Sequence, residues 1–172
     1  GWEGVAQFGL DHPTFNAAYP NFKTPLVDGL VNDLGMNRVR LEVRSGAENS
    51  VDYWARYGDL SSPTYNNALW RCYRYSTAND NADPNSINPA GFHFSELDRM
   101  VNLVVLPLRQ AMAARGEKLY INLQYVAFYS QMTGAGCPAG LQYLHTSPSE
   151  YGEFMLAATD HLKTAFGIVP DQ

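Results

Sequence analysis

Hydrophobic and polar residues alternate strictly over two stretches of the chain. Residues 37–44 place three aliphatic side chains on one side and four charged ones on the other: Val39, Leu41 and Val43 against Arg38, Arg40, Glu42 and Arg44. Residues 118–126 repeat the arrangement, with Leu119, Ile121 and Leu123 against Tyr120, Asn122 and Gln124. A period of two predicts β-strands with one aliphatic and one polar face. A shorter apolar run at 5–10, followed by turn-forming residues at 11–13, predicts a further strand.

Three other segments have apolar residues spaced three and four apart, which predicts helices over 24–35, 95–116 and 147–167. Each begins with a serine or threonine suited to cap a helix and ends at a glycine. Pro107 lies inside the second helix and is expected to kink it.

The fifty residues 45–94 separate the second strand from the second helix and show no sustained periodicity. A loop of this length is usually functional or disordered. Its many aromatic residues favour an ordered segment that covers a ligand, with a short helix near 66–71. A second loop covers residues 127–146.

Three strand–helix units in succession predict parallel strands covered by helices. An open, doubly wound sheet buries both faces of its inner strands, so these strands would be apolar on both sides. The polar faces at 37–44 and 118–126 instead favour the lumen of a barrel. The sequence therefore predicts α/β architecture in the form of a partial (β/α)8 TIM barrel. Residues 1–172 would be the N-terminal part of this catalytic domain, incomplete at the C-terminus.

The 172 residues accommodate the first three barrel units and a long insertion between strand two and helix two. On this interpretation, Gln172 marks a truncation, and the remainder of the barrel lies in the same polypeptide or in a second chain.

The composition narrows the class of partner. The chain carries 12 Lys+Arg and 17 Asp+Glu, a net charge of −5, and 13% of its residues are aromatic. This acidic balance without a basic cluster argues against nucleic acid and anionic membranes. No apolar run approaches the roughly 20 residues of a transmembrane helix. A neutral polar ligand fits better.

The segment Gly35-Met36-Asn37-Arg38-Val39-Arg40-Leu41-Glu42 carries a family resemblance. It resembles the second strand of retaining glycoside hydrolases with a (β/α)8 barrel, the clan of cellulases, mannanases and β-galactosidases. Arg40 falls on the arginine that supports the nucleophilic carboxylate in that family. The alternative is that Arg40 and Glu42 form a paired, buried charge cluster that braces the barrel.

The resemblance implies hydrolysis of O-glycosidic bonds by a retaining mechanism with two carboxylates. Both carboxylates would follow Gln172, since Glu42 and Glu48 do not match the catalytic motif. This chain alone would then be inactive. A carbohydrate-binding barrel without catalytic activity is the alternative function.

Substrate-binding candidates are the polar residues near the strand ends and the aromatic residues of the long loop: Glu42, Arg44, Trp54, Tyr57, Asn122, Gln124 and Tyr125. Sugar rings pack on aromatic faces, which favours a glycan ligand. For Asn122 and Gln124 the alternative is hydrogen-bonded filling of the lumen. For Trp54, and more strongly for Trp70 and Tyr73, the alternative is that these rings form a hydrophobic core within the loop itself. Many relatives carry a histidine where this chain has Gln124.

No cofactor or metal is expected. The four histidines, His12, His93, His145 and His161, lack metal-binding spacing, and the chain has no P-loop, dinucleotide fingerprint or nucleophile elbow. Cys72 and Cys137 lie in loops after neighbouring strands and form either one disulfide or two free thiols. A disulfide would indicate secretion.

Overall fold

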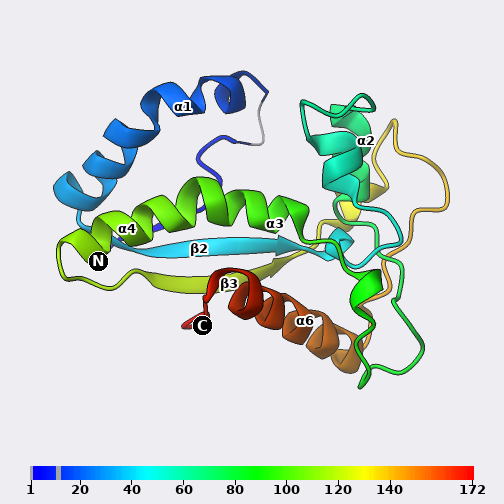
Figure 1. The fold of residues 1–172 in the computed structure, drawn as a ribbon. Helices are drawn as coiled ribbons and strands as arrows, with labels where there is room; N and C mark the ends of the chain where they lie inside the picture. Colours follow the sequence, from blue (N-terminus) through cyan, green and yellow to red (C-terminus); the bar gives the residue numbers. More distant parts are fainter. Residues whose placement is uncertain (1, 11–12) are drawn as a thin grey trace. The chain divides into compact units, whose positions relative to one another are not determined.

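The computed structural model describes residues 2–10 and 13–172. Three strands, β1 (Trp2–Val5), β2 (Met36–Arg44) and β3 (Tyr120–Val126), form one sheet in the order β1-β2-β3, and β1 runs parallel to β2 (Figure 1). The second and third predicted strands are therefore confirmed. His12 and the start of the predicted turn at 11–13 lie outside the described residues.

The predicted TIM barrel is wrong. Within the described residues, the sheet contains three strands and does not close on itself. The polar strand faces that suggested a lumen have a simpler cause, because an open sheet that is covered on one face produces the same alternation. On β2, Val39 and Leu41 are fully buried while Arg38 is exposed. The predicted segregation of the strand faces is confirmed even though the barrel is not.

The first strand begins earlier than expected. The strand predicted at 5–10 lies at Trp2–Val5, and residues 6–10 form turns. The backbone amide of Ala6 still bonds the carbonyl of Arg40, at 2.9 Å, but the amide of Gln7 turns back to the carbonyl of Val5. Within these turns, Phe8 adopts a positive φ of 43°, which is uncommon for a residue other than glycine.

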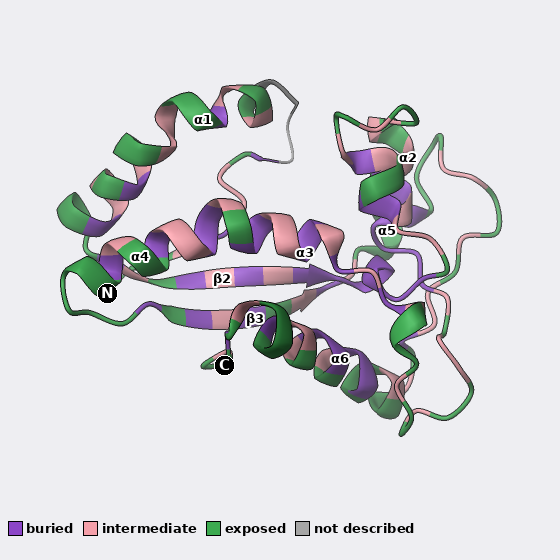
Figure 2. Cartoon of the chain, in the orientation of Figure 1, coloured by how far each residue is buried: buried purple, intermediate pink, exposed green. Residues whose placement is uncertain are grey.

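The chain divides into two compact units. The first unit comprises Gly1–Glu42, Leu97–Gln124 and Pro170–Gln172, and the second comprises Val43–Glu96 and Tyr125–Val169. Figure 2 shows that buried residues lie along β2 and along the helix beside it, which is formed by residues 95–114.

In the first unit, α1 (Pro13–Asp28) continues into a π-helical turn (Gly29–Asp33). This helix was predicted only from residue 24 onward. Its earlier start brings Tyr19, which is 2% exposed, into the core. The helix ends as predicted before Gly35, whose φ of 63° suits a glycine.

The predicted helix at 95–116 consists of α3 (Ser95–Met100), a π-helical turn (Val101–Val105) and α4 (Leu106–Ala114). The change in hydrogen bonding immediately precedes Pro107, the residue expected to disturb the helix. Because proline has no N–H, it cannot bond the carbonyl of Leu103, four residues earlier. The Tyr19 hydroxyl donates to that carbonyl instead, at 2.8 Å. A side chain of α1 thus satisfies the group that Pro107 leaves unpaired.

In the second unit, the long loop after β2 is ordered. It contains α2 (Asn67–Tyr73), which confirms the short helix predicted near 66–71, and a π-helical turn (Trp54–Gly58). Two 3-10 turns (Ser45–Ala47 and Pro89–Gly91) complete it. After β3 come α5 (Tyr129–Met132) and α6 (Pro148–Phe166). The α6 boundaries agree with prediction, since Ser147 caps its start and Gly167, at φ 62°, ends it.

Cys72 and Cys137 are joined by a disulfide, with 5.6 Å between their Cα atoms. Of the two alternatives left open by the sequence, the bridge is the one found. Disulfides of this kind are typical of secreted proteins.

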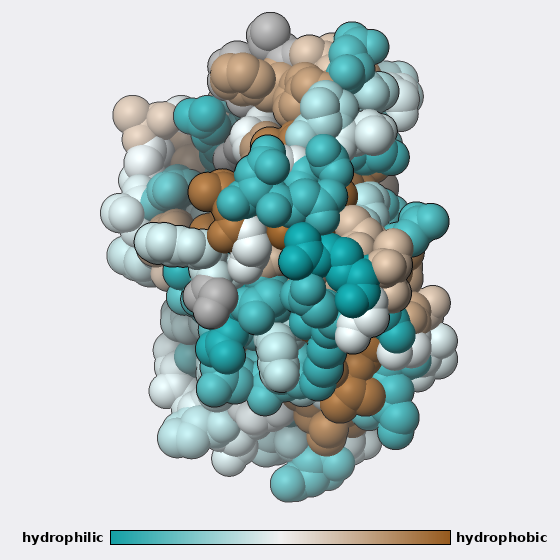
Figure 3. Space-filling view, turned by 90° about the vertical axis from the view of Figure 1, so that its left-hand side faces the viewer, coloured by the Kyte–Doolittle hydropathy of each residue, from teal (hydrophilic) through white to brown (hydrophobic). Residues whose placement is uncertain are grey.

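Figure 3 shows one face of the molecule, where hydrophilic side chains predominate and hydrophobic ones form separate patches.

Candidate functional site

Arg40 and Glu42 lie two residues apart on β2 and share its polar face. Nη2 of Arg40 is 3.4 Å from Oε1 of Glu42, and the two side chains are 37% and 13% exposed. The other oxygen of Glu42, Oε2, accepts a hydrogen bond of 3.0 Å from the Gln7 side chain. Nε of Arg40 is buried and has no hydrogen-bond partner among the described residues. Among the described residues, Glu42 is thus the ion-pair partner of the Arg40 guanidinium, and Nε has no acceptor.

Asn122 and Gln124 lie on the polar face of β3. The Asn122 amide donates to Oε1 of Glu3 over 3.4 Å, and Gln124 is exposed. Asn122 also lines a hollow of about 260 Å³ together with Arg38 and Tyr120. These two amides are accessible to a ligand and do not fill a closed lumen.

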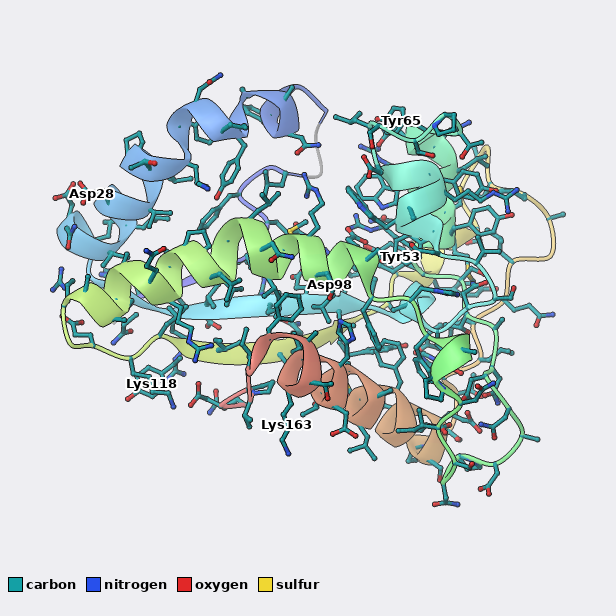
Figure 4. All side chains as sticks on the ribbon, in the orientation of Figure 1. Asp28, Tyr53, Tyr65, Asp98, Lys118 and Lys163 are labelled. Atoms are coloured by element: carbon teal, nitrogen blue, oxygen red, sulfur yellow. A yellow bond between two sulfur atoms is a disulfide. The ribbon has the colours of Figure 1, made fainter. Side chains whose placement is uncertain are left out.

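Arg44 is assigned to the second unit and is 5% exposed, whereas the Arg40 side chain is 37% exposed. The charge of Arg44 acts on a buried network in which Glu96 accepts hydrogen bonds from Arg74 and, at 2.6 Å, from Tyr53. Tyr53 is labelled in Figure 4. Burial alone would raise the pKa of Glu96, but the positive charges of Arg74 and Arg44 lower it below its usual value. Burial, followed by the charge of Glu96, raises the pKa of Tyr53. This network keeps one fixed ionisation state.

Trp54 and Tyr57, the two predicted stacking residues, take part in an aromatic cluster. Trp54 is 7% exposed and meets Trp70 edge to face at 5.7 Å, while Tyr57 stacks on Tyr73 at 5.1 Å. The loop therefore has a core of its own, the alternative considered for Trp54, Trp70 and Tyr73. The packing covers the Trp54 ring.

Tyr125, the last of the predicted residues, belongs to a chain of hydrogen bonds that the sequence did not reveal. Its hydroxyl lies 2.7 Å from Nδ1 of His145 and donates to the Tyr143 hydroxyl at 3.0 Å. Nε2 of His145 lies 2.6 Å from Oε2 of Glu48, and both side chains are 1% exposed. The other oxygen of Glu48 accepts the backbone N–H of Asp80 at 2.9 Å.

This network follows the carboxyl ends of β2 and β3, where ligand sites of parallel sheets usually lie. Burial and the hydrogen bond with Tyr143 raise the pKa of Tyr125, so its hydroxyl stays protonated and serves as a hydrogen-bonding group, not as a nucleophile. Glu48 and His145 are 97 residues apart in sequence. Only their positions after strand ends could have suggested that they meet.

No group of three or more His, Cys, Asp or Glu residues suited to a metal ion occurs within residues 2–10 and 13–172. Among the helices of the same residues, none is both long and apolar enough to cross a membrane. No protein-family model, curated protein or solved structure matches the chain.

Proposed function

We propose that this chain takes part in the retaining hydrolysis of O-glycosidic bonds, with Arg40 as the residue that supports the nucleophilic carboxylate. The observation that carries the proposal is the state of the Arg40 side chain. Its guanidinium is partly exposed, Nε has no partner among the described residues, and Glu42 is shared with Gln7. A guanidinium within hydrogen-bond reach keeps a partly buried carboxylate ionised and oriented.

Neither glutamate near the strand ends is assigned a catalytic role. Glu42 is occupied by Arg40 and Gln7, and Glu48 is buried against His145. The general acid and the nucleophile of a retaining mechanism lie about 5 to 5.5 Å apart. In this proposal both come from chain outside these 172 residues. The accessible amides of Asn122 and Gln124 would bind sugar hydroxyls.

The test uses the natural protein that contains these residues, assayed on cello-, manno- and β-galacto-oligosaccharides. We expect hydrolysis with retention of configuration, followed by NMR of the first product. Arg40→Ala should lower kcat/KM by about 10²–10³ because it removes support for the nucleophile. Arg40→Lys keeps the charge without the planar donors and should retain part of the activity.

A change in melting temperature of less than about 2 °C for Arg40→Ala would show that the loss is functional, since partly exposed ion pairs contribute little to stability. Saccharide binding without hydrolysis by the natural protein would favour the non-catalytic carbohydrate-binding alternative. Full activity of Arg40→Ala would contradict the role proposed for this residue.

A further inference from the structure

Two large aromatic rings are exposed directly after β3. Phe128 is 50% exposed and Tyr129 is 66% exposed. Several other aromatic residues of the second unit are buried, including Tyr53, Trp70 and Tyr75 at 2% each, and Tyr151 on α6 is less exposed, at 43%. Exposed rings of this size in adjacent positions mark a binding surface more often than rings scattered singly.

The backbone beneath these rings is fixed by buried contacts. The Phe128 ring meets the buried Tyr75 ring edge to face at 5.4 Å. Tyr129 begins the short helix α5, whose last residue, Met132, is 2% exposed and packs with Tyr75 and Val126. The backbone amide of Gln131 closes the turn on the carbonyl of Phe128 at 3.0 Å. Five residues beyond α5, Cys137 is bonded to Cys72 of α2. A ligand that binds here therefore meets a surface with little conformational entropy left to lose.

The segment around the two rings carries no formal charge. From residue 119 to residue 149, thirty-one positions, the sequence contains no Asp, Glu, Lys or Arg, although 17% of the whole chain is charged. The exposed neighbours are neutral hydrogen-bonding residues, namely Ser130, Gln131, Thr133 and Gln142. This segment carries no Asp, Glu, Lys or Arg side chain that could pair with a phosphate or with a charged peptide. It suits a ligand that is neutral and rich in hydroxyl groups.

We propose that Phe128 and Tyr129 form a stacking platform for a pyranose ring of a neutral oligosaccharide, with the surrounding amides and hydroxyls bonding its hydroxyl groups. The apolar C–H face of a pyranose packs on an aromatic ring, and its hydroxyls remain free to bond polar side chains at the edge. This inference rests on the proposed function for its ligand class. It assigns binding residues in the second unit and does not use Arg40.

The test is a calorimetric and NMR titration of the 172-residue chain with neutral pentasaccharides of glucose, mannose and xylose. We expect one of them to bind and to shift the amide signals of residues 127–133. Phe128→Ala and Tyr129→Ala should each weaken binding about three- to tenfold, and the double variant at least tenfold, because each removes part of the stacking surface. Tyr129→Phe should keep the affinity within about twofold, since it retains the ring.

Leu156→Ala is the matched control, because Leu156 is 54% exposed but lies on α6, outside the uncharged segment. It should leave the dissociation constant unchanged. Because all these positions are exposed, the variants should fold, which circular dichroism and an intact disulfide would verify. Unchanged affinity in the double variant, with saccharide still bound, would overturn the platform and leave the proposed function standing. Absence of saccharide binding by both the chain and the natural protein would overturn both. A double variant that alters only the oligomeric state would assign the rings to a protein interface and overturn the platform.

Discussion

The two units of the molecule fill their interiors with different kinds of residue. The interior of the first unit is mainly aliphatic, with Val39, Leu41, Val104 and Leu108 at 0% exposure. The interior of the second contains aromatic rings together with buried polar and charged side chains. Within residues 2–10 and 15–172, every buried residue of that polar kind lies in the second unit: Arg44, Ser45, Glu48, Asn49, Arg74, Ser76, Thr77, Glu96, His145 and Glu153.

The difference follows from how each unit satisfies its backbone. Strands and helices pair their own amides and carbonyls, so the first unit can have an apolar interior. The long loops of the second unit lack such ladders, and side chains replace them. Asn49 donates to the carbonyl of Ser76 at 2.8 Å, and Ser45 donates to that of Tyr75 at 3.0 Å. A buried loop therefore requires buried polar side chains, and Asn49 and Ser45 have this role here.

The sharpest test of this contrast compares two arginines. Arg74 pairs with Glu96 at a site where both side chains are about 5% exposed, whereas Arg40 is 37% exposed. Arg74→Met should lower the free energy of unfolding by about 3–5 kcal/mol, because it leaves the charge of Glu96 buried without its partner. Arg40→Met, the matched control, should cost less than about 1 kcal/mol. Urea unfolding measures both, and equal losses would show that the two pairs do not differ in kind.

A second test removes the disulfide of the second unit. Replacing Cys72 and Cys137 by serine should destabilise the protein by about 2–4 kcal/mol, because the bridge closes a loop of 65 residues in the unfolded chain. Hydrogen exchange would locate the effect. We expect amides of α2 and α5 to lose protection first, and those of Val39 and Leu41 to keep theirs. Equal loss in both units would show that they unfold together.

The smallest effect concerns Glu153, which is 4% exposed and whose Oε1 has no partner among the described residues. Burial, followed by the negative charges of Asp80, Glu150, Glu48 and Asp83, raises the pKa of Glu153 from 4.5 to about 7. The neutral form is thus favoured in the folded state. Its contribution to stability is complete below pH 4.5 and is lost as the pH rises through about 7.

Glu153→Gln keeps a neutral side chain at every pH. Relative to the parent protein, it should therefore gain about 1–3 kcal/mol at pH 8 and less than about 1 kcal/mol at pH 5, measured by urea unfolding at both values. Glu117→Gln provides the control, since the Glu117 side chain is 45% exposed and lies in the first unit. A gain that is the same at both pH values would contradict a buried carboxylate under repulsion.

Periodicity in the sequence predicted the helices and strands whose buried faces are aliphatic. It placed β2, β3 and the whole of α6, and it placed Gly35, which follows the π-helical turn after α1. It missed the N-terminal half of α1 because the contact that stabilises this half, Tyr19 with Leu103, joins residues 84 apart. The polar strand faces also led to the prediction of a barrel. A polar face, however, indicates only that no helix covers that side of the strand.

The residues of the candidate site also differ in whether local spacing in the sequence predicted their contacts. Arg40 and Glu42 were predicted to share a face because they are two residues apart on a strand, and they do pair. The contact between Glu48 and His145 depends on two loops meeting after separate strands, and no local spacing specifies that. Likewise, local spacing does not specify the exposure of Phe128, because this exposure depends on which other aromatic rings pack in the core of the loop.

The bridge between Cys72 and Cys137 also determines how the protein responds to mechanical force. The chain leaves the second unit after Glu96 and returns at Tyr125, and this excursion lies inside the covalent ring closed by the two cysteines. Tension applied at the two termini passes through the sulfur bridge and bypasses the enclosed chain. At about 3.3–3.6 Å per extended residue, the 65 residues of the ring correspond to roughly 215–235 Å of length that stretching cannot release. Reduction of the bridge would allow these enclosed residues to extend under force.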